Sequence, residues 1–231
     1  MTVLLETRGL SKNFGGLKAV SDVNFAIERG EVRAVIGPNG AGKTTFVSLI
    51  SGRIAPSAGT ILFEGEDVTA LPAFRRVQKG IAYTFQITSI YANLSVAENV
   101  ALAAHQPGGK ASFEPLERVG LADRASQIAG TLAYGHQRLL EVAMGLALKP
   151  KLLILDEPTQ GLSDAEIDNF IMLVREVAKN ATVLLIEHNM PLVMELAHRI
   201  TVLDRGMILA EGAPEDIRAN AAVQAAYLGT G

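Results

Sequence analysis

The chain has 231 residues, with 21 Lys and Arg against 24 Asp and Glu, so its formal net charge is −3, and it contains no Cys. The missing thiols exclude a disulfide framework, a thiolate metal site and a Cys nucleophile. The slightly acidic balance, without a block of basic residues, argues against nucleic acid as the partner. The longest uncharged stretch, residues 80–97, is too polar for a membrane span, and the N-terminus lacks the pattern of a secretory signal, which permits a cytosolic location.

The N-terminal third of the chain has the texture of strands interrupted by one helix. Residues 3–27 alternate apolar and polar side chains, as half-buried antiparallel strands do. The apolar run 32–36, a Gly-rich turn and the helical segment 43–51 together predict a strand–turn–helix unit. Residues 59–68 predict a hairpin, and residues 81–86 predict a short buried strand.

Two helical regions follow, and each opens on a capping box. Ser95 and Glu98 begin the first, and residues 95–149 are mostly helical. Ser163 and Glu166 begin the second, whose apolar side chains repeat with the helical period.

Buried strands flank the second helix. Short apolar runs at 152–155 and 183–186 predict these strands, another helix begins near Met190, and a hairpin turns at 204–206. Strands that alternate with helices predict an α/β fold with a mostly parallel sheet. An antiparallel β piece would stand at the front of the chain, and a helical insert in its middle.

Residues 37–44 match the phosphate-loop pattern G-x-x-x-x-G-K-[ST], directly after a strand and at the start of a helix. Glycines let backbone N–H groups converge on an anion, and the helix N-terminus adds partial positive charge. Lys43 would reach the β and γ phosphates of a nucleotide, and the Thr44 hydroxyl would ligate Mg²⁺. Thr45 either adds a phosphate hydrogen bond or serves only as a residue of the first helical turn.

Two carboxylates, Asp156 and Glu157, follow the apolar strand 152–155. Ligands of open α/β sheets bind at this carboxyl end of the strands. Asp156 therefore fits a Mg²⁺ ligand, and Glu157 fits a base that orients or deprotonates the attacking water.

In this order, the motifs resemble those of the ATP-binding cassette ATPases. Besides the phosphate loop and the acidic pair, the resemblance rests on Gln86, the segment 132–138, the segment 161–164 and His188. It spans nearly the whole chain and implies ATP hydrolysis, with ATP and Mg²⁺ as cofactors.

The resemblance also implies how the chain is divided. Residues 1–231 would form one ATPase domain, in which 1–86 and 150–231 make the antiparallel β subdomain and a RecA-like phosphate-loop core. Residues 87–149 would make the inserted helical subdomain that carries the family's signature segment.

Further site residues are implied only by the family pattern. Gln86 would touch Mg²⁺ and water, and His188 would contact the γ-phosphate and hold the water. Phe14 would stack on adenine, with core packing as the alternative, and Val20 would contact the same base. The phosphate loop would bind ATP through Asn39, Gly40, Ala41, Gly42, Lys43, Thr44 and Thr45.

The signature segment would act on a nucleotide held by a second subunit. In the family, two cassettes pack head to tail, and each phosphate loop faces the partner's signature helix. Ala133, Tyr134, Gly135 and His136 stand at the contacting positions. Ala133 replaces the usual Ser, so one hydroxyl that could donate to the γ-phosphate is missing.

The Tyr before Gly in the signature and the tail, including 186–190 and 226–229, resemble the cassettes of branched-chain amino acid uptake transporters. That likeness implies a second cassette, two transmembrane permease subunits and, indirectly, a periplasmic substrate-binding protein as partners. It implies a cytoplasmic protein, peripheral on the inner face of the cell membrane.

Two other kinds of function stay open from the sequence. The first is a cassette ATPase of another system, such as urea, amide, aromatic acid or envelope-lipid transport, or a non-transport ATPase. The second is a phosphate-loop kinase or GTPase-like switch, which predicts an acceptor-site or base-recognition motif that the sequence lacks.

Overall fold

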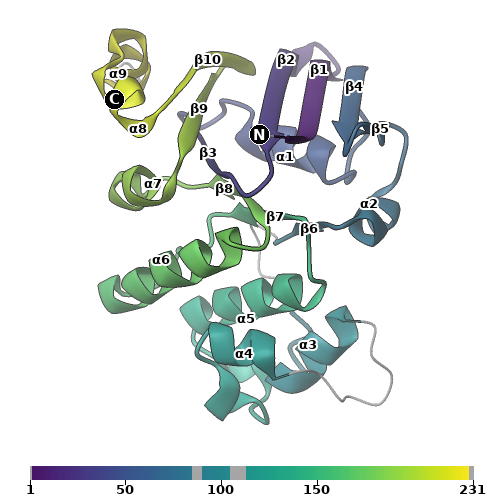
Figure 1. Cartoon of the computed structure of the whole chain (residues 1–231), viewed down its shortest axis with the longest axis vertical. Coiled ribbons are helices and arrows are strands. Elements are labelled where there is room, and N and C mark those ends of the chain that lie inside the picture. The colour runs from purple at the N-terminus through teal and green to yellow at the C-terminus, as the bar shows by residue number, and fades with distance from the viewer. Residues whose placement is uncertain (1, 85–89, 105–112, 229–231) are drawn as a thin grey trace.

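The computed structural model describes residues 2–84, 90–104 and 113–228 (Figure 1). The strands are β1 (Val3–Phe14), β2 (Leu17–Glu28), β3 (Val32–Ile36), β4 (Ala58–Phe63), β5 (Glu66–Asp67), β6 (Ile81–Tyr83), β7 (Leu152–Asp156), β8 (Thr182–Ile186), β9 (Arg199–Asp204) and β10 (Met207–Gly212). The α-helices are α1 (Lys43–Ile50), α2 (Ala73–Lys79), α3 (Val96–Ala103), α4 (Glu114–Arg118), α5 (Tyr134–Ala147), α6 (Asp164–Ala178), α7 (Met190–Leu196), α8 (Pro214–Ala219) and α9 (Ala221–Leu228). Two 3-10 turns, η1 (Ala122–Arg124) and η2 (Ala129–Thr131), lie between α4 and α5.

The strands form two sheets. One is antiparallel, in the order β2-β1-β4-β5, and the other has the order β10-β9-β3-β8-β7-β6. In the second sheet every described pairing is parallel except β9 with β10. The predicted α/β class, with antiparallel strands at the front and a mostly parallel sheet, is confirmed.

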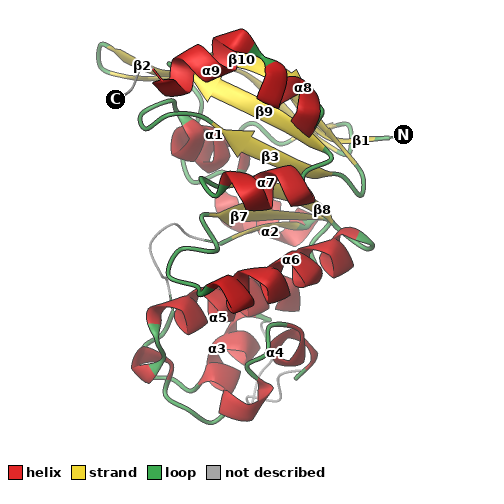
Figure 2. Ribbon diagram, turned by 90° about the vertical axis from the view of Figure 1, so that its left-hand side faces the viewer, coloured by secondary structure: helices red, strands yellow, loops and turns green. Residues whose placement is uncertain are grey.

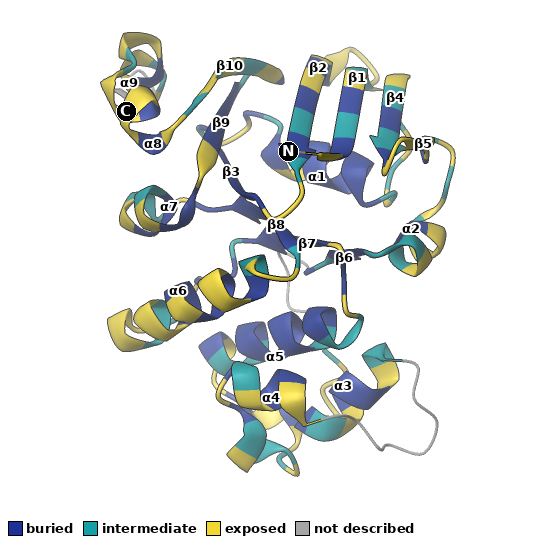
Figure 3. Ribbon diagram, viewed as in Figure 1, coloured by how far each residue is buried: buried dark blue, intermediate teal, exposed yellow. Residues whose placement is uncertain are grey.

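Strand alternation distributes the second sheet over three core clusters. On β3, Val35 packs with α1, whereas Ala34 and Ile36 pack with α7, α8 and α9. Figure 2 shows α7 in front of this sheet and α1 behind it. On β7, Leu153 and Leu155 pack toward α5 and α6. Because β3, β7 and β8 are buried along their whole length (Figure 3), the residues that follow them are held in fixed positions.

Helices α3, α4 and α5 lie together at the end of the molecule opposite the antiparallel sheet (Figure 1). The Ser95 hydroxyl accepts a hydrogen bond from the Glu98 N–H, and the Ser95 N–H donates to the Glu98 carboxylate at 2.7 Å, so the predicted capping box is present. The box of Ser163 and Glu166 at the start of α6 is present as well. Within the described ranges, no helix combines the length and the apolarity needed to cross a membrane.

Four elements differ from the sequence prediction or add to it. The strand expected over 81–86 ends at Tyr83, and residues 85–86 lie outside the described part of the chain. Helix α2 was not predicted, since its seven residues are too few for a clear periodic pattern, although Pro72 and Gly80 bracket it. Helices α8 and α9 were not predicted either.

Helix α2 contributes a buried cation to the end of α1. The Arg76 guanidinium donates to the carbonyl oxygens of Leu49 at 2.7 Å and Ile50 at 2.8 Å, and also to those of Leu71 and Thr69. Burial lowers the pKa of Arg76 to about 10. Its positive charge lies at the negative end of α1, whose other end follows the phosphate loop.

We expect Arg76→Ala to lower the free energy of unfolding by about 2 to 4 kcal/mol, because it leaves buried carbonyl groups without donors. Chemical denaturation measures this loss. Arg75→Ala, on the exposed side of α2, is the matched control and should change stability by less than about 0.5 kcal/mol. Equal effects of the two substitutions would contradict the capping role of Arg76.

Candidate functional site

The phosphate loop joins β3 to α1 in a backbone conformation that requires glycine. Gly37 has φ 151° and Gly42 has φ 99°. A Cβ atom on Gly37 would lie 2.1 Å from the carbonyl oxygen of Leu203, and one on Gly42 would lie 2.4 Å from that of Ala19. The two glycines therefore let β2 and β9 pack directly against the loop.

The loop leaves anion-binding groups open to solvent. Asn39, Gly40 and Thr44 are exposed, Ala41 is buried, and Thr45 is partly buried. No side chain caps the N-terminus of α1, so its first N–H groups remain available to a phosphate.

Lys43 is folded back onto the loop that precedes it. Its ammonium group donates to the carbonyl oxygens of Gly37 at 2.6 Å and Pro38 at 3.1 Å. Burial lowers the pKa of Lys43, and the negative charges of Glu157 and Asp156 oppose that shift. The structure thus brings the predicted lysine into the electrostatic reach of the predicted acidic pair.

Asp156 ends β7 and is 1% exposed. Its Oδ2 accepts a hydrogen bond of 2.7 Å from the Tyr83 hydroxyl, whereas its Oδ1 is buried and has no hydrogen-bond partner among the described residues. Burial raises the pKa of Asp156, the hydrogen bond from Tyr83 lowers it, and the charge of Glu157 raises it. A buried carboxylate oxygen without a donor is suited to a hard cation such as Mg²⁺.

Glu157 turns away from β7 in the left-handed conformation, with φ 49°. Its N–H donates to the carbonyl oxygen of Ile186 at 2.9 Å, which ties it to β8. Its Oε1 lies 2.8 Å from Nε2 of His188, whose side chain is 45% exposed. The two predicted catalytic side chains are therefore in direct contact at the carboxyl ends of β7 and β8.

A buried carboxylate, Glu187, holds the loops on both sides of that contact. Its Oε1 accepts from the N–H of Thr159 at 3.1 Å and from the Thr159 hydroxyl at 2.5 Å. Its Oε2 accepts from the N–H of His188 at 2.9 Å. The loop after Glu157 and the backbone of His188 are thereby joined through one side chain.

Arg138 connects the signature helix α5 to the acidic pair. It is 2% exposed, pairs with Glu141 at 3.0 Å, and donates to the carbonyl oxygens of Asp156 at 3.2 Å and Glu157 at 3.0 Å. The order of the motifs in the sequence gives no reason to expect these two hydrogen bonds, which join residues 18 and 19 positions apart.

The signature segment packs against the loop before α6. A Cβ atom on Gly135 would lie 2.8 Å from the carbonyl oxygen of Gly161, so only glycine fits there. The Tyr134 hydroxyl donates to Oε1 of Gln160 at 3.2 Å. Ala133 and Tyr134 are exposed and no side chain caps the start of α5, so this surface is open to a second molecule.

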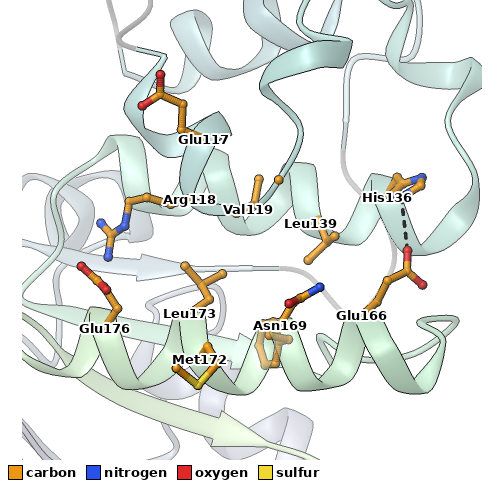
Figure 4. A pocket seen from close by; sticks show the side chains of 12 residues that line it. Glu117, Arg118, Val119, His136, Leu139, Glu166, Asn169, Met172, Leu173 and Glu176 are labelled. Atoms are coloured by element: carbon orange, nitrogen blue, oxygen red, sulfur yellow. Dashed lines mark ion pairs between the residues drawn. The ribbon is translucent and has the colours of Figure 1, made fainter.

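His136 points toward α6 (Figure 4). Its Nε2 lies 3.2 Å from Oε1 of Glu166, and its buried Nδ1 has no hydrogen-bond partner within the described ranges. The pair borders a cavity of about 590 Å³ between α4, α5 and α6. The structure therefore joins His136 to the helix after the 161–164 segment.

The remaining predicted residues lie at or beyond the edge of the described site. Phe14 is 49% exposed at the end of β1, with the Lys12 ammonium 5.1 Å from its ring centroid. Val20 is buried in the core with α1, beside the backbone of Gly206. Their contacts with adenine remain predictions. Gln86 lies outside the described residues.

Sequence reasoning missed two tyrosines near the site. One is Tyr83, which holds Asp156. The other is Tyr227 of α9, whose pKa burial raises and a backbone hydrogen bond with Gly37 lowers. A cavity of about 240 Å³ separates the phosphate loop from the 204–205 turn and α9. In the sequence, the pattern of the tail indicated a family but did not indicate that α9 lies beside the phosphate loop.

Comparisons with known proteins agree with this geometry. The model of the ABC transporter family matches residues 20–160, and that of the branched-chain amino acid ATP-binding cassette transporter matches residues 207–231. The chain is 40% identical to the high-affinity branched-chain amino acid transport ATP-binding protein BraF of Pseudomonas aeruginosa, covering 98% of each chain. It is 39% identical to LivG of Escherichia coli K12, a protein of the same description, again over 98% of each.

Solved structures give the same result for the fold. A nucleotide-free ATP-binding cassette from an ABC transporter superposes with a TM-score of 0.91 at 28% identity, covering 98% of this chain and 99% of the other. A cassette in its ADP conformation superposes with a TM-score of 0.90 at 28% identity, covering 99% and 100%.

We expect Asp156→Asn to raise the free energy of unfolding of the nucleotide-free protein at pH 7, on the order of 1 kcal/mol, since it removes a buried charge with an unpaired oxygen. The pKa of Asp156 is higher in the folded than in the unfolded protein, so the ionised carboxylate lowers stability once the pH exceeds its pKa in the unfolded chain. The stability gained by Asp156→Asn should therefore shrink toward acid pH. Urea denaturation at pH 7 and at an acid pH measures the difference. Asp168→Asn, exposed on α6, is the control, and a loss of stability in Asp156→Asn at pH 7 would contradict the prediction.

Proposed function

The chain belongs to the ABC transporter family of ATP-binding cassettes, and on that premise we propose that it is the ATP-hydrolysing subunit of an importer for branched-chain or related amino acids. The observation that carries the proposal is the contact between Oε1 of Glu157 and Nε2 of His188, at 2.8 Å. This contact lies beside a phosphate loop whose Lys43 interacts electrostatically with both Glu157 and Asp156. The substrate class is supported by the family model that matches residues 207–231 and by the names of BraF and LivG.

The residues of the phosphate loop would hold the nucleotide. The N–H groups of the loop and of the start of α1 would surround the phosphates, and Lys43 would exchange its two carbonyl partners for phosphate oxygens. The unpaired Oδ1 of Asp156 and the exposed hydroxyl of Thr44 fit a Mg²⁺ ion bound with the nucleotide. Mg²⁺, when bound, would neutralise charge on the phosphate oxygens.

Glu157 would orient the attacking water and accept its proton. His188 lies within hydrogen-bond distance of Oε1 of Glu157, so it would fix the carboxylate and face the γ-phosphate side of the site. Arg138 would hold the carbonyl of Glu157 while the side chain acts. We retain Gln86 as a proposed ligand of Mg²⁺ and water on the family pattern alone.

The active form we propose is a head-to-tail pair of cassettes, identical or paralogous. The exposed Ala133 and Tyr134, with Gly135 and the start of α5, would complete the phosphate site of the partner. Residues 87–149 would act in this pair as the helical signature subdomain, and 1–86 with 150–231 as the β subdomain and RecA-like core.

A mostly apolar groove is the surface that we assign to a permease subunit. Its cavity of about 230 Å³ lies between α2, β6 and α5, with Val77, Tyr83, Met144 and Leu148 among the residues that line it. A membrane-embedded partner that inserts a short segment here would place the chain on the cytoplasmic face of the inner membrane. A periplasmic substrate-binding protein would then act indirectly, through the permease.

We expect Glu157→Gln to retain ATP binding and to accumulate an ATP-bound dimer, while hydrolysis slows by roughly 10² to 10⁴ fold because the base is lost. Phosphate release and gel filtration with MgATP measure the two effects. Unchanged turnover in Glu157→Gln would discard the assignment of the base.

Lys43→Ala should bind no labelled ATP and stay monomeric, since phosphate charge is left unpaired.

Met144→Glu should weaken association with the permease, because it places a charge in the apolar groove, while ATP binding stays unchanged. Co-purification with co-expressed permease subunits of a branched-chain amino acid importer measures this. Met172→Glu on the exposed face of α6 is the matched control. Equal recovery of the permease with both variants would rule out the groove.

A further inference from the structure

The two oxygens of the Asp156 carboxylate have different surroundings. Oδ2 accepts a hydrogen bond from the hydroxyl of Tyr83 at 2.7 Å, and the buried Oδ1 has no partner in the part of the chain that the structure describes. A carboxylate that is held through one oxygen has a fixed rotation about its last bond, so the direction of the other oxygen is fixed as well. Within the described part of the chain, the Tyr83 hydroxyl is thus the donor that fixes this carboxylate.

Tyr83 is itself held by Arg53. The Arg53 guanidinium lies 5.2 Å from the Tyr83 ring centroid, and Nη1 of Arg53 donates to the Tyr83 hydroxyl at 3.3 Å. A tyrosine hydroxyl has one proton to donate and lone pairs to accept. With Arg53 as its donor, the proton of Tyr83 is directed to Asp156.

The backbone adds a second connection between the same strands. Tyr83 pairs with Ile154 in the parallel ladder of β6 and β7. The next residue, Thr84, accepts at its hydroxyl from the N–H of Asp156 at 3.3 Å.

We infer that Tyr83 is a positioning residue for metal binding: its hydroxyl turns the Asp156 carboxylate so that Oδ1 faces the Mg²⁺ that accompanies ATP. This inference rests on the proposed function, in which Asp156 is a Mg²⁺ ligand. Groups that orient a ligating carboxylate typically change metal affinity by about 10-fold or more when they are removed. In this role Tyr83 would act on the metal through the Asp156 carboxylate that it holds.

The test compares Tyr83→Phe with the unchanged protein in two binding measurements. The first is the affinity for ATP in EDTA, which reports the phosphate loop without metal. The second is Mn²⁺ binding to the protein–ATP complex, followed by electron paramagnetic resonance. We expect Tyr83→Phe to leave ATP affinity in EDTA unchanged and to weaken Mn²⁺ binding by about 10-fold. Tyr91→Phe, at an exposed tyrosine, is the matched control and should change neither.

Asp156→Asn separates the inference from the function on which it rests. If Asp156→Asn weakens Mn²⁺ binding and Tyr83→Phe does not, the positioning role is overturned and the proposed metal ligand stands. If Asp156→Asn binds Mn²⁺ as the unchanged protein does, the assignment of the metal ligand is overturned. If Tyr83→Phe lowers ATP affinity in EDTA as much as it lowers Mn²⁺ binding, Tyr83 is merely structural and the inference fails.

Discussion

The burial of one carboxylate, that of Asp156, is the constraint around which the site is arranged. An ionised group with an unpaired oxygen costs free energy in the interior, and it persists only where surrounding elements fix its place. Three elements do so here. Strand β6 brings Tyr83 to its side chain, α5 brings Arg138 to its carbonyl, and β8 accepts the N–H of the next residue, Glu157.

The same arrangement explains why Glu157 can hold an unfavourable backbone conformation. A non-glycine residue at φ 49° is strained unless its neighbours determine it. Its N–H and its carbonyl are both bonded, to β8 and to Arg138, and its side chain meets His188. The strain aims the carboxylate out of the sheet, beyond the end of β7, where a bound phosphate would lie.

Sequence was sufficient for the parts of the site that are local. The phosphate loop and the acidic pair each follow a buried strand, and their spacing is set by a few consecutive residues, so Lys43, Asp156 and Glu157 could be found in advance. Contacts between distant segments could not be found. Tyr83 lies 73 residues from Asp156, and a lone Tyr at a strand end carries no motif. Arg76 and Arg138 resemble ordinary surface cations in sequence, and only the packed structure buries them.

Tyr83 links the acidic pair to the groove between α2 and α5. Its hydroxyl meets the carboxylate at the end of β7, while the residue also lines the groove between α2 and α5, next to Arg53. One aromatic side chain therefore contacts both the carboxylate and the groove. A molecule bound in the groove that tilts the Tyr83 ring or displaces the Arg53 guanidinium would also shift the Asp156 carboxylate, without contacting it. Such coupling is reciprocal, so a change at the carboxylate would also alter the shape of the groove.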